Sequence, residues 1–363
     1  MTTHSPLFQP LPHAALSLRN RIAMAPMTRS RALGNVPGEL HRTYYGQRAG
    51  AGLVITEGTS PSADGLGYAR IPGLYTQAQA DGWRDVATAA HAGGAKLVVQ
   101  LMHTGRIGHA LNLPEGAELI APSAVAAAGQ MWTDSAGMQN HPVPKAMDAD
   151  DLARVRGDFV QAAQLAIAAG LDGVELHAAN GYLLGQFLNP RSNVRTDAYG
   201  GSAENRHRFV LEVVDAVVAA IGADRVGIRL SPFNPFNDLA ANFDGEEEEF
   251  LALVQALSTR KLGYLHLIAT PGAVPPAVVR KVRQAFDGAL ILAGDYNRAR
   301  AEADLASGLA DIIAFGRPFI ANPDLPQRLL DDAELTAFDP ATLYTPGAAG
   351  YSDYPTLSEA VAA

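Results

Sequence analysis

Residues 173–190 read GVELHAANGYLLGQFLNP, and their first six positions form a short, almost continuously apolar run. A run of this length and apolarity is typical of a parallel strand that is buried on both faces. Seven similar runs recur along the chain: RIAMAP (21–26), LVITEG (53–58), KLVVQL (96–101), VGIRLS (226–231), YLHLIA (264–269), LILAG (290–294) and DIIAFG (311–316).

Helical patterns separate the eight apolar runs. Residues 148–170 begin with Asp148 as a predicted N-cap and end at Gly170, and residues 244–261 place Asp244 and Glu247 at N-cap and N3 spacing. Further helices are predicted at 37–49, 77–92, 202–221, 274–286, 298–307 and 323–331. Eight alternating strands and helices predict a closed (β/α)₈ barrel. The alternative is an open doubly wound sheet, although no G-x-G-x-x-G follows any of the runs.

Two connections in this pattern are too long for plain loops. Residues 103–147, between the third strand and its helix, contain strand-like pieces and turn residues, so we expect a small hairpin or lid over the barrel mouth. Residues 232–244 form a second long loop. No interdomain linker is evident, and the pattern predicts a single barrel domain over residues 1–363 with the lid inserted at about 103–147.

The composition narrows the function classes. Hydrophobic residues make up 48% of the chain and charged residues 18%, which allows a large core. The net charge of −9 and the lack of a basic block make nucleic acid and anionic membranes unexpected partners. The chain has no cysteine, so disulfides, thiolate nucleophiles and cysteine-based metal sites are excluded. We see no signal peptide and no membrane span, and expect a cytoplasmic protein.

In a (β/α)₈ barrel the active site lies at the carboxyl ends of the strands. Side chains alternate along a strand, so Glu175 and His177 share one face, and Gln100 and Arg229 are the polar residues on the corresponding faces of their own strands. We expect Gln100, His177 and Arg229 to converge on one barrel mouth. Taken singly, each of these residues also fits a structural role.

Other chemistries leave weaker signals. No H-x-x-x-H accompanied by acidic residues predicts a metal site, and no G-x-S-x-G elbow predicts a serine hydrolase. Gly294-Asp295 and Gly316-Arg317 end the seventh and eighth strands, which is the usual position for phosphate in this fold. The glycine backbone could approach an anion with Arg317 beside it, or the glycines could merely permit tight turns.

Six segments, in order and over nearly the whole chain, carry a family resemblance. They are RNRIAMAPMTRSRA (19–32), ITEGTSPSADGLGY (55–68), VQLMHTGR (99–106), GVELHAANGYLLGQFLNPRSNVRTDAYGGSAENRHRF (173–209), IRLSPFNPFND (228–238) and FGRPFIANPDLPQRL (315–329). With these segments the chain resembles the Old Yellow Enzyme family of FMN-dependent ene-reductases. The resemblance implies a barrel that holds one FMN non-covalently at its mouth, with NADPH or NADH as electron donor.

The resemblance also implies which residues bind the cofactor. The flavin contacts would be Pro26, Met27, Thr28, Gly58, Gln100 and Arg229, and the phosphate cradle would be Gly294, Asp295, Gly316 and Arg317. The family divides by whether the position of Thr28 holds Thr or Cys, and this chain is similar to the Thr branch. It has Met102 where many members have Trp, which bears on substrate preference.

Finally, the resemblance implies the catalytic roles. His177 and Asn180 would hydrogen-bond the carbonyl oxygen of the substrate, Tyr182 would donate a proton, and Tyr68 and Tyr354 would form pocket walls. The implied reaction is hydride transfer from FMN N5 to the activated C=C bond of an α,β-unsaturated carbonyl or nitro compound, by a monomer or homodimer. The competing classes are a non-redox barrel enzyme acting on a phosphorylated small molecule and a flavin-binding protein without turnover.

Overall fold

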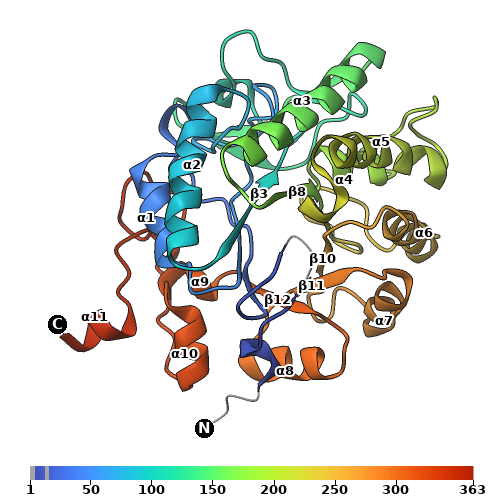
Figure 1. Ribbon diagram of the computed structural model, residues 1–363. Helices are drawn as coiled ribbons and strands as arrows, with labels where there is room; N and C mark the ends of the chain where they lie inside the picture. Colours follow the sequence, from blue (N-terminus) through green and yellow to red (C-terminus); the bar gives the residue numbers. More distant parts are fainter. Residues whose placement is uncertain (1–4, 13–15, 363) are drawn as a thin grey trace.

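Eight parallel strands close into a barrel in the computed structural model, which describes residues 5–12 and 16–362 (Figure 1). In chain order the barrel strands are β1 (Ile22–Met24), β2 (Leu53–Ile55), β3 (Lys96–Leu101), β8 (Gly173–Ala178), β9 (Val226–Leu230), β10 (Tyr264–Ile268), β11 (Ala289–Ala293) and β12 (Ile312–Phe315). The first strand pairs with both β2 and β12, so the sheet has no edge. The closed barrel is therefore confirmed, and the open sheet is wrong.

Helices lie outside the strands and surround them (Figure 1). They are α1 (Glu39–Gln47), α2 (Gln77–Ala92), α3 (Ala149–Ala168), α4 (Leu183–Leu188), α5 (Ala203–Ile221), α6 (Glu246–Ser258), α7 (Pro276–Ala285), α8 (Arg298–Ala306), α9 (Pro318–Ala321), α10 (Leu325–Asp331) and α11 (Leu357–Ala362), with short 3-10 turns η1 (Pro6–Phe8), η2 (Leu33–Asn35), η3 (Ala110–Asn112), η4 (Ala223–Arg225) and η5 (Pro340–Thr342). The eight predicted helices are all present, whereas α4, α9 and α11 were not predicted. Within the described ranges, no helix combines the length and apolarity needed to cross a membrane.

The two predicted helix starts had different outcomes. Asp148 caps α3 as predicted: its side chain accepts the backbone N–H of Asp151, 2.9 Å away. The prediction of Asp244 as the cap of α6 is wrong, because left-handed Gly245 (φ 83°) occupies the N-cap position without a side-chain cap. The carboxylate of Glu246 turns back instead and accepts the backbone N–H groups of Phe233 and Asn242. This helix start therefore anchors the loop 232–244.

The barrel interior and its outer face are packed differently. Small and β-branched side chains fill much of the interior. Leu16 and Leu18, which precede β1, belong to the same interior cluster. Its members from the strands and their ends include Ala23, Ala25, Leu53, Ile55, Val98, Ile291 and Ala314. The opposite faces of the strands pack under the helices in a larger apolar cluster. Burying one such aliphatic side chain stabilises the fold by roughly 1.5–3 kcal/mol. This packing gives the strand ends a rigid base.

The insertion between β3 and α3 contains the predicted hairpin. Strands β5 (Gln130–Thr133) and β6 (Gly137–Asn140) pair antiparallel, while β4 (Ile120–Ala121) and β7 (Lys145–Ala146) form a second, parallel pair. Arg70 connects the hairpin to the rest of the protein, because its guanidinium pairs with Asp134 and donates to the carbonyl of Tyr344. The hairpin is thus fixed beside the C-terminal segment.

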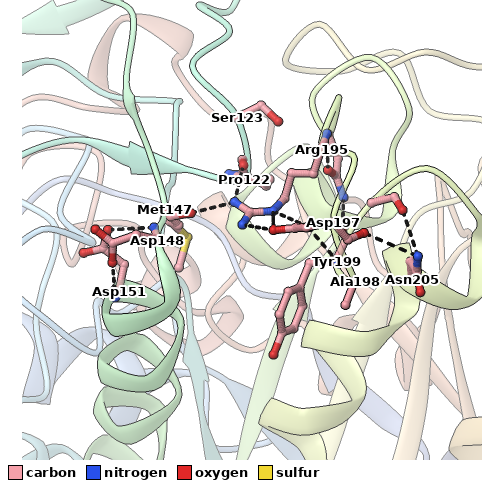
Figure 2. A network of polar contacts seen from close by, with 12 residues as sticks. Pro122, Ser123, Met147, Asp148, Asp151, Arg195, Asp197, Ala198, Tyr199 and Asn205 are labelled. Carbon is pink, nitrogen blue, oxygen red and sulfur yellow. Dashed lines mark hydrogen bonds and ion pairs between the residues drawn. The ribbon is translucent and has the colours of Figure 1, made fainter.

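A polar network holds the connection that follows α4. Figure 2 shows Arg195 between the carbonyl oxygens of Pro122 and Met147, to which its Nη1 donates at 2.8 and 2.6 Å. The same guanidinium pairs with Asp197, whose carboxylate also accepts the backbone N–H of Tyr199. This arginine therefore ties the 189–202 connection to the insertion and to the start of α3.

Candidate active site

Two adjoining cavities open at the carboxyl ends of the barrel strands. The larger, of about 950 Å³, is lined by these predicted site residues: Pro26, Thr28, Tyr68, Gln100, His177, Asn180, Tyr182 and Arg229. The smaller, of about 460 Å³, is lined by Pro26, Met27, Arg229, Gly294, Asp295, Gly316 and Arg317. Pro26 and Arg229 border both cavities, so together they form one elongated site. The predicted convergence of Gln100, His177 and Arg229 is confirmed.

Two predicted residues lie outside this lining. A side chain at Gly58 would meet the Sδ and Cε atoms of Met102 at 2.5 Å, so Met102 occupies the space between Gly58 and the cavity wall. The hydroxyl of Tyr354 accepts the backbone N–H of Asp339 at 3.0 Å. Tyr344 lines the cavity instead of Tyr354, because the C-terminal segment reaches the mouth ten residues earlier than the sequence suggests.

His177 is held in one neutral tautomer. It ends the inward face of β8, and the backbone N–H of Ala179 donates to its Nδ1 at 3.3 Å. Burial, with the charge of Arg229 as the next cause, lowers the pKa of His177 well below its usual value. The ring is therefore neutral at pH 7 and carries its proton on Nε2. One N–H donor is thus available to a ligand in the cavity.

Asn180 is oriented through the loop 232–244. The backbone N–H of Phe236 donates to Asn234 Oδ1 at 3.0 Å, so the Asn234 amide must present Nδ2 on its other side. That Nδ2 donates to Asn180 Oδ1, also at 3.0 Å. Asn180 itself is left-handed (φ 55°), and its backbone N–H donates to Ser231 Oγ. The Nδ2 group of Asn180 therefore remains as a second donor for the cavity.

We expect the Asn234→Ala variant to bind more weakly any ligand whose oxygen accepts a hydrogen bond from Asn180. Without Asn234, the Asn180 amide loses the partner that fixes which of its ends is the donor, and one hydrogen bond is worth about 0.5–1.5 kcal/mol. The affinity for a phenolate or carbonyl ligand should fall up to about tenfold. Titration calorimetry measures it, with the wild-type protein as the reference. An Asn234→Ala protein with unchanged affinity would refute this orientation chain.

Tyr182 turns into the cavity although the strand pattern ends before it. It is the N-cap residue of α4, is 7% exposed, and its ring meets the His177 ring edge-on with centroids 4.8 Å apart. Its hydroxyl lies 3.0 Å from that of Tyr68. Burial raises the pKa of Tyr182 well above 10, so the phenol stays protonated at neutral pH. It is thus a proton-bearing group next to the two N–H donors.

Arg229 is a buried cation that faces both cavities. Its side chain comes from β9, is 8% exposed, and its Nε is buried without a protein hydrogen-bond partner in the described part of the chain. Burial lowers its pKa, while Glu175 opposes that shift. A buried guanidinium with an unused N–H is suited to an electron-rich ligand atom.

Gly294 and Gly316, at the ends of two strands, differ in whether the backbone itself requires a glycine. At Gly294 (φ 129°) a side chain would meet the backbone nitrogen of Thr270 at 2.7 Å, so the turn itself requires glycine. At Gly316 the nearest atom to a side chain would be Met27 Sδ at 3.7 Å, an ordinary contact. The fold does not require glycine at Gly316, and its bare backbone leaves room for a ligand in the smaller cavity. Arg317 lies beside this cavity and its side chain is mostly exposed, with Nη1 4.0 Å from Asp295 Oδ1.

The apolar rim of the larger cavity consists of residues that were not predicted from the sequence. The hairpin supplies Trp132 and Met138, the loop 232–244 supplies Phe236, and the C-terminal segment supplies Tyr344; each of these side chains is more than half exposed. No local pattern marks them, since they meet only through the packing of distant segments. They can contact a ligand larger than its polar head group.

Comparison with known proteins places this geometry in a family. The family model described as the NADH:flavin oxidoreductase / NADH oxidase family matches residues 6–335. The chain belongs to this family, the Old Yellow Enzyme family. Its membership identifies an NAD(P)H-dependent flavin oxidoreductase and decides against a non-redox barrel enzyme.

Curated Old Yellow Enzyme relatives match along almost their full length. The chain is 41% identical to 12-oxophytodienoate reductase 1 of Oryza sativa subsp. japonica, covering 98% of this chain and 94% of that protein. It is 41% identical to a probable flavin mononucleotide-dependent alkene reductase of Leishmania infantum, with 97% of each covered. Both similarities span the barrel and the insertion.

Solved Old Yellow Enzyme structures share the fold closely. Morphinone reductase in complex with tetrahydroNAD is 47% identical with a TM-score of 0.92, over 97% of each chain. The old yellow enzyme homologue from Zymomonas mobilis is 39% identical with a TM-score of 0.92, over 97% of this chain and 99% of that one. The predicted family and barrel are thereby confirmed.

The site also fits the flavin mononucleotide of the Old Yellow Enzyme family. The double cavity has a larger part and a smaller part, and the smaller part lies beside the bare Gly316 backbone and Arg317. Arg229 borders both parts, and its Nε–H has no hydrogen-bond partner among the described residues. An electron-rich ring suits the larger part next to Arg229, and a phosphate suits the smaller part.

Proposed function

We propose that the protein reduces the activated C=C bond of α,β-unsaturated carbonyl or nitro compounds with electrons from NADPH or NADH through non-covalent FMN. The observation that carries this proposal is one cavity that contains two oriented N–H donors, His177 Nε2 and Asn180 Nδ2, beside the protonated hydroxyl of Tyr182. The relatives named as alkene and oxophytodienoate reductases support the substrate class.

The cofactor would lie along the double cavity. Pro26, Met27, Thr28, Gln100 and Arg229 would contact its ring, and Gly294, Asp295, Gly316 and Arg317 would surround its phosphate. When bound, FMN supplies the two-electron chemistry that links nicotinamide oxidation to alkene reduction. The electron-rich edge of the reduced ring would be matched by the positive charge of Arg229.

The substrate oxygen would lie between His177 and Asn180. Negative charge develops on this oxygen as the alkene is reduced, and two fixed donors stabilise it in the manner of an oxyanion hole. Both donors are held by the protein beforehand, through Ala179 for His177 and through Asn234 for Asn180. Little reorganisation is then needed at the moment of reaction.

Tyr182 would give its hydroxyl proton to the α-carbon of the substrate. Its high pKa keeps the proton in place at neutral pH, and the hydroxyl of Tyr68 can donate to the phenolate that remains. The apolar rim of Trp132, Met138, Phe236 and Tyr344 would contact the body of the substrate or the nicotinamide dinucleotide.

The visible spectrum tests this function. We expect the purified protein to be yellow, with flavin absorption that bleaches on anaerobic addition of NADPH or NADH and returns when a cyclic enone is added. Parallel additions of NADPH and NADH compare the two donors. A protein that binds no FMN contradicts the proposal, and one whose reduced flavin is not reoxidised by the enone is a flavoprotein without alkene turnover.

A further inference from the structure

A fully buried carboxylate lies inside the barrel next to the cavity. Glu175 is two residues before His177 on β8 and shares its inward face. The strand register places it opposite Gln100 of β3 on one side and Gly227 of β9 on the other. The ring of Tyr264 fills the space over Gly227. Glu175 is thus one layer deeper than His177 and Arg229, which line the cavity.

Both oxygens of Glu175 are engaged. Gln100 Nε2 donates to Oε1 at 2.7 Å, and His266 Nδ1 donates to Oε2 at 2.8 Å. Glu175 is not among the residues that line either cavity, whereas Gln100 and Arg229 are. Glu175 therefore does not contact a bound ligand itself, and we expect it to act on the ligand through Gln100 and Arg229.

The contact with Gln100 fixes the direction of that amide. An ionised carboxylate only accepts hydrogen bonds, so Gln100 must turn its nitrogen towards Glu175. The amide carbonyl and the second N–H hydrogen are then left for a ligand. The pyrimidine edge of a flavin carries an N–H between two carbonyl groups, which matches one acceptor beside one donor.

The charge of Glu175 also matters to Arg229. Burial raises the pKa of Glu175, whereas the hydrogen bond from His266, the charge of Arg229 and the hydrogen bond from Gln100 lower it; the net shift is downward, so the carboxylate is ionised at neutral pH. Burial lowers the pKa of His266, which is neutral. In the register of β8 and β9, Arg229 lies opposite His177, two residues beyond Glu175 on the same inward face, so the two charged side chains are diagonal neighbours. The carboxylate therefore offsets part of the positive charge that Arg229 presents to the cavity.

We propose that Glu175 is a positioning residue for the flavin, which holds the Gln100 amide with its carbonyl oxygen available to the ring N–H and moderates the charge of Arg229. It thereby sets both the affinity for FMN and the reduction potential of the bound cofactor. This inference rests on the proposed function and assigns the barrel interior a part in it.

The test compares four holoproteins: wild type, Glu175→Gln, Gln100→Leu and the double variant. Glu175→Gln should weaken FMN about tenfold, the equivalent of about one well-formed hydrogen bond. It should also favour reduced over oxidised FMN about tenfold, because Arg229 loses its counter-charge, and this raises the midpoint potential by about 30 mV. The double variant should bind FMN no more weakly than Gln100→Leu. Dissociation constants come from fluorescence titration and potentials from spectroelectrochemistry.

Asp151→Asn is the matched control, since Asp151 is another buried carboxylate but borders neither flavin cavity. It should change neither FMN affinity nor potential. Wild-type protein without FMN affinity would refute the proposed function itself. If wild type binds FMN and Glu175→Gln keeps both its affinity and its potential, the function stands and the role of Glu175 is overturned.

A further variant leaves Glu175 in place if its replacement prevents folding. In Gln100→Glu two carboxylates face each other, so one keeps a proton to a higher pH than usual. The other groups near the pair are Arg229, His266, His177 and Tyr264. The protonated carboxyl introduced at position 100 would imitate the native amide, and FMN affinity should fall about tenfold as pH rises and that proton is lost. A pH-independent affinity would equally overturn the proposal.

Discussion

Replacement of Tyr182 by Phe is expected to slow alkene reduction by about 10²–10⁴-fold, the usual contribution of a positioned general acid. The variant loses one hydroxyl and keeps the ring that packs edge-on against His177. Reduction of the flavin by NADPH should stay close to the wild-type rate, since that half-reaction needs no proton from Tyr182. Stopped-flow measurements of the two half-reactions separate the effects.

Tyr68→Phe is the control for this experiment. It removes the hydroxyl that lies 3.0 Å from Tyr182 Oη but leaves the proton on Tyr182. We expect a smaller loss, of about tenfold, from the missing hydrogen bond to the phenolate. Equal slowing of both half-reactions in Tyr182→Phe would argue against proton donation.

The pKa of Tyr182 adds a pH criterion. The donor works only while protonated, and its pKa is raised well above 10 by burial. Alkene reduction should therefore show no loss from Tyr182 ionisation as pH rises towards 10. A loss of rate with rising pH that has its midpoint near neutrality and disappears in Tyr182→Phe would contradict this pKa.

Replacement of His177 by Ala is expected to slow alkene reduction by about 10²–10³-fold, the effect of removing one donor from an oxyanion hole. His177 Nε2 is the donor that the neutral tautomer leaves for the substrate oxygen. The variant should also bind phenolic ligands more weakly, because their oxygen would occupy the same position. Transient kinetics measure the rate, and titration of the charge-transfer band measures the affinity.

His177→Asn provides the comparison for His177→Ala. A shorter amide donor on the same strand face should recover part of the phenol affinity, whereas Ala recovers none. Since His177 is neutral, phenol affinity in the wild type should not change through His177 titration between pH 6 and 8, given that its pKa lies well below 6.5. Unchanged phenol affinity in His177→Ala would remove this residue from the oxygen site.

The barrel itself could be predicted from eight apolar runs, because strands buried on both faces have a distinctive composition. The alternation of side chains along those runs correctly predicted that Gln100, His177 and Arg229 point into the same barrel mouth. The same alternation also marked Glu175, but its role depends on the facing Gln100 and His266, which lie 75 and 91 positions away in the chain.

Loop residues and caps were less predictable. Asp244 has the sequence spacing of an N-cap, yet the structure uses Gly245 because Glu246 is recruited to hold the loop 232–244. Tyr354 was expected at the pocket wall, but Tyr344 is there. In both cases the position depends on how one loop packs against another, which short-range patterns do not encode.

The sequence by itself therefore determined the barrel and the inward direction of its strand residues, because side-chain direction in a strand follows from a period of two. Only the tertiary structure decided which nitrogen of His177 carries the proton and which end of the Asn180 amide donates. The latter depends on Asn234, 54 positions further along the chain. Hydrogen-bond direction is decided by the partner in space, and for these side chains the partners are supplied by folded loops.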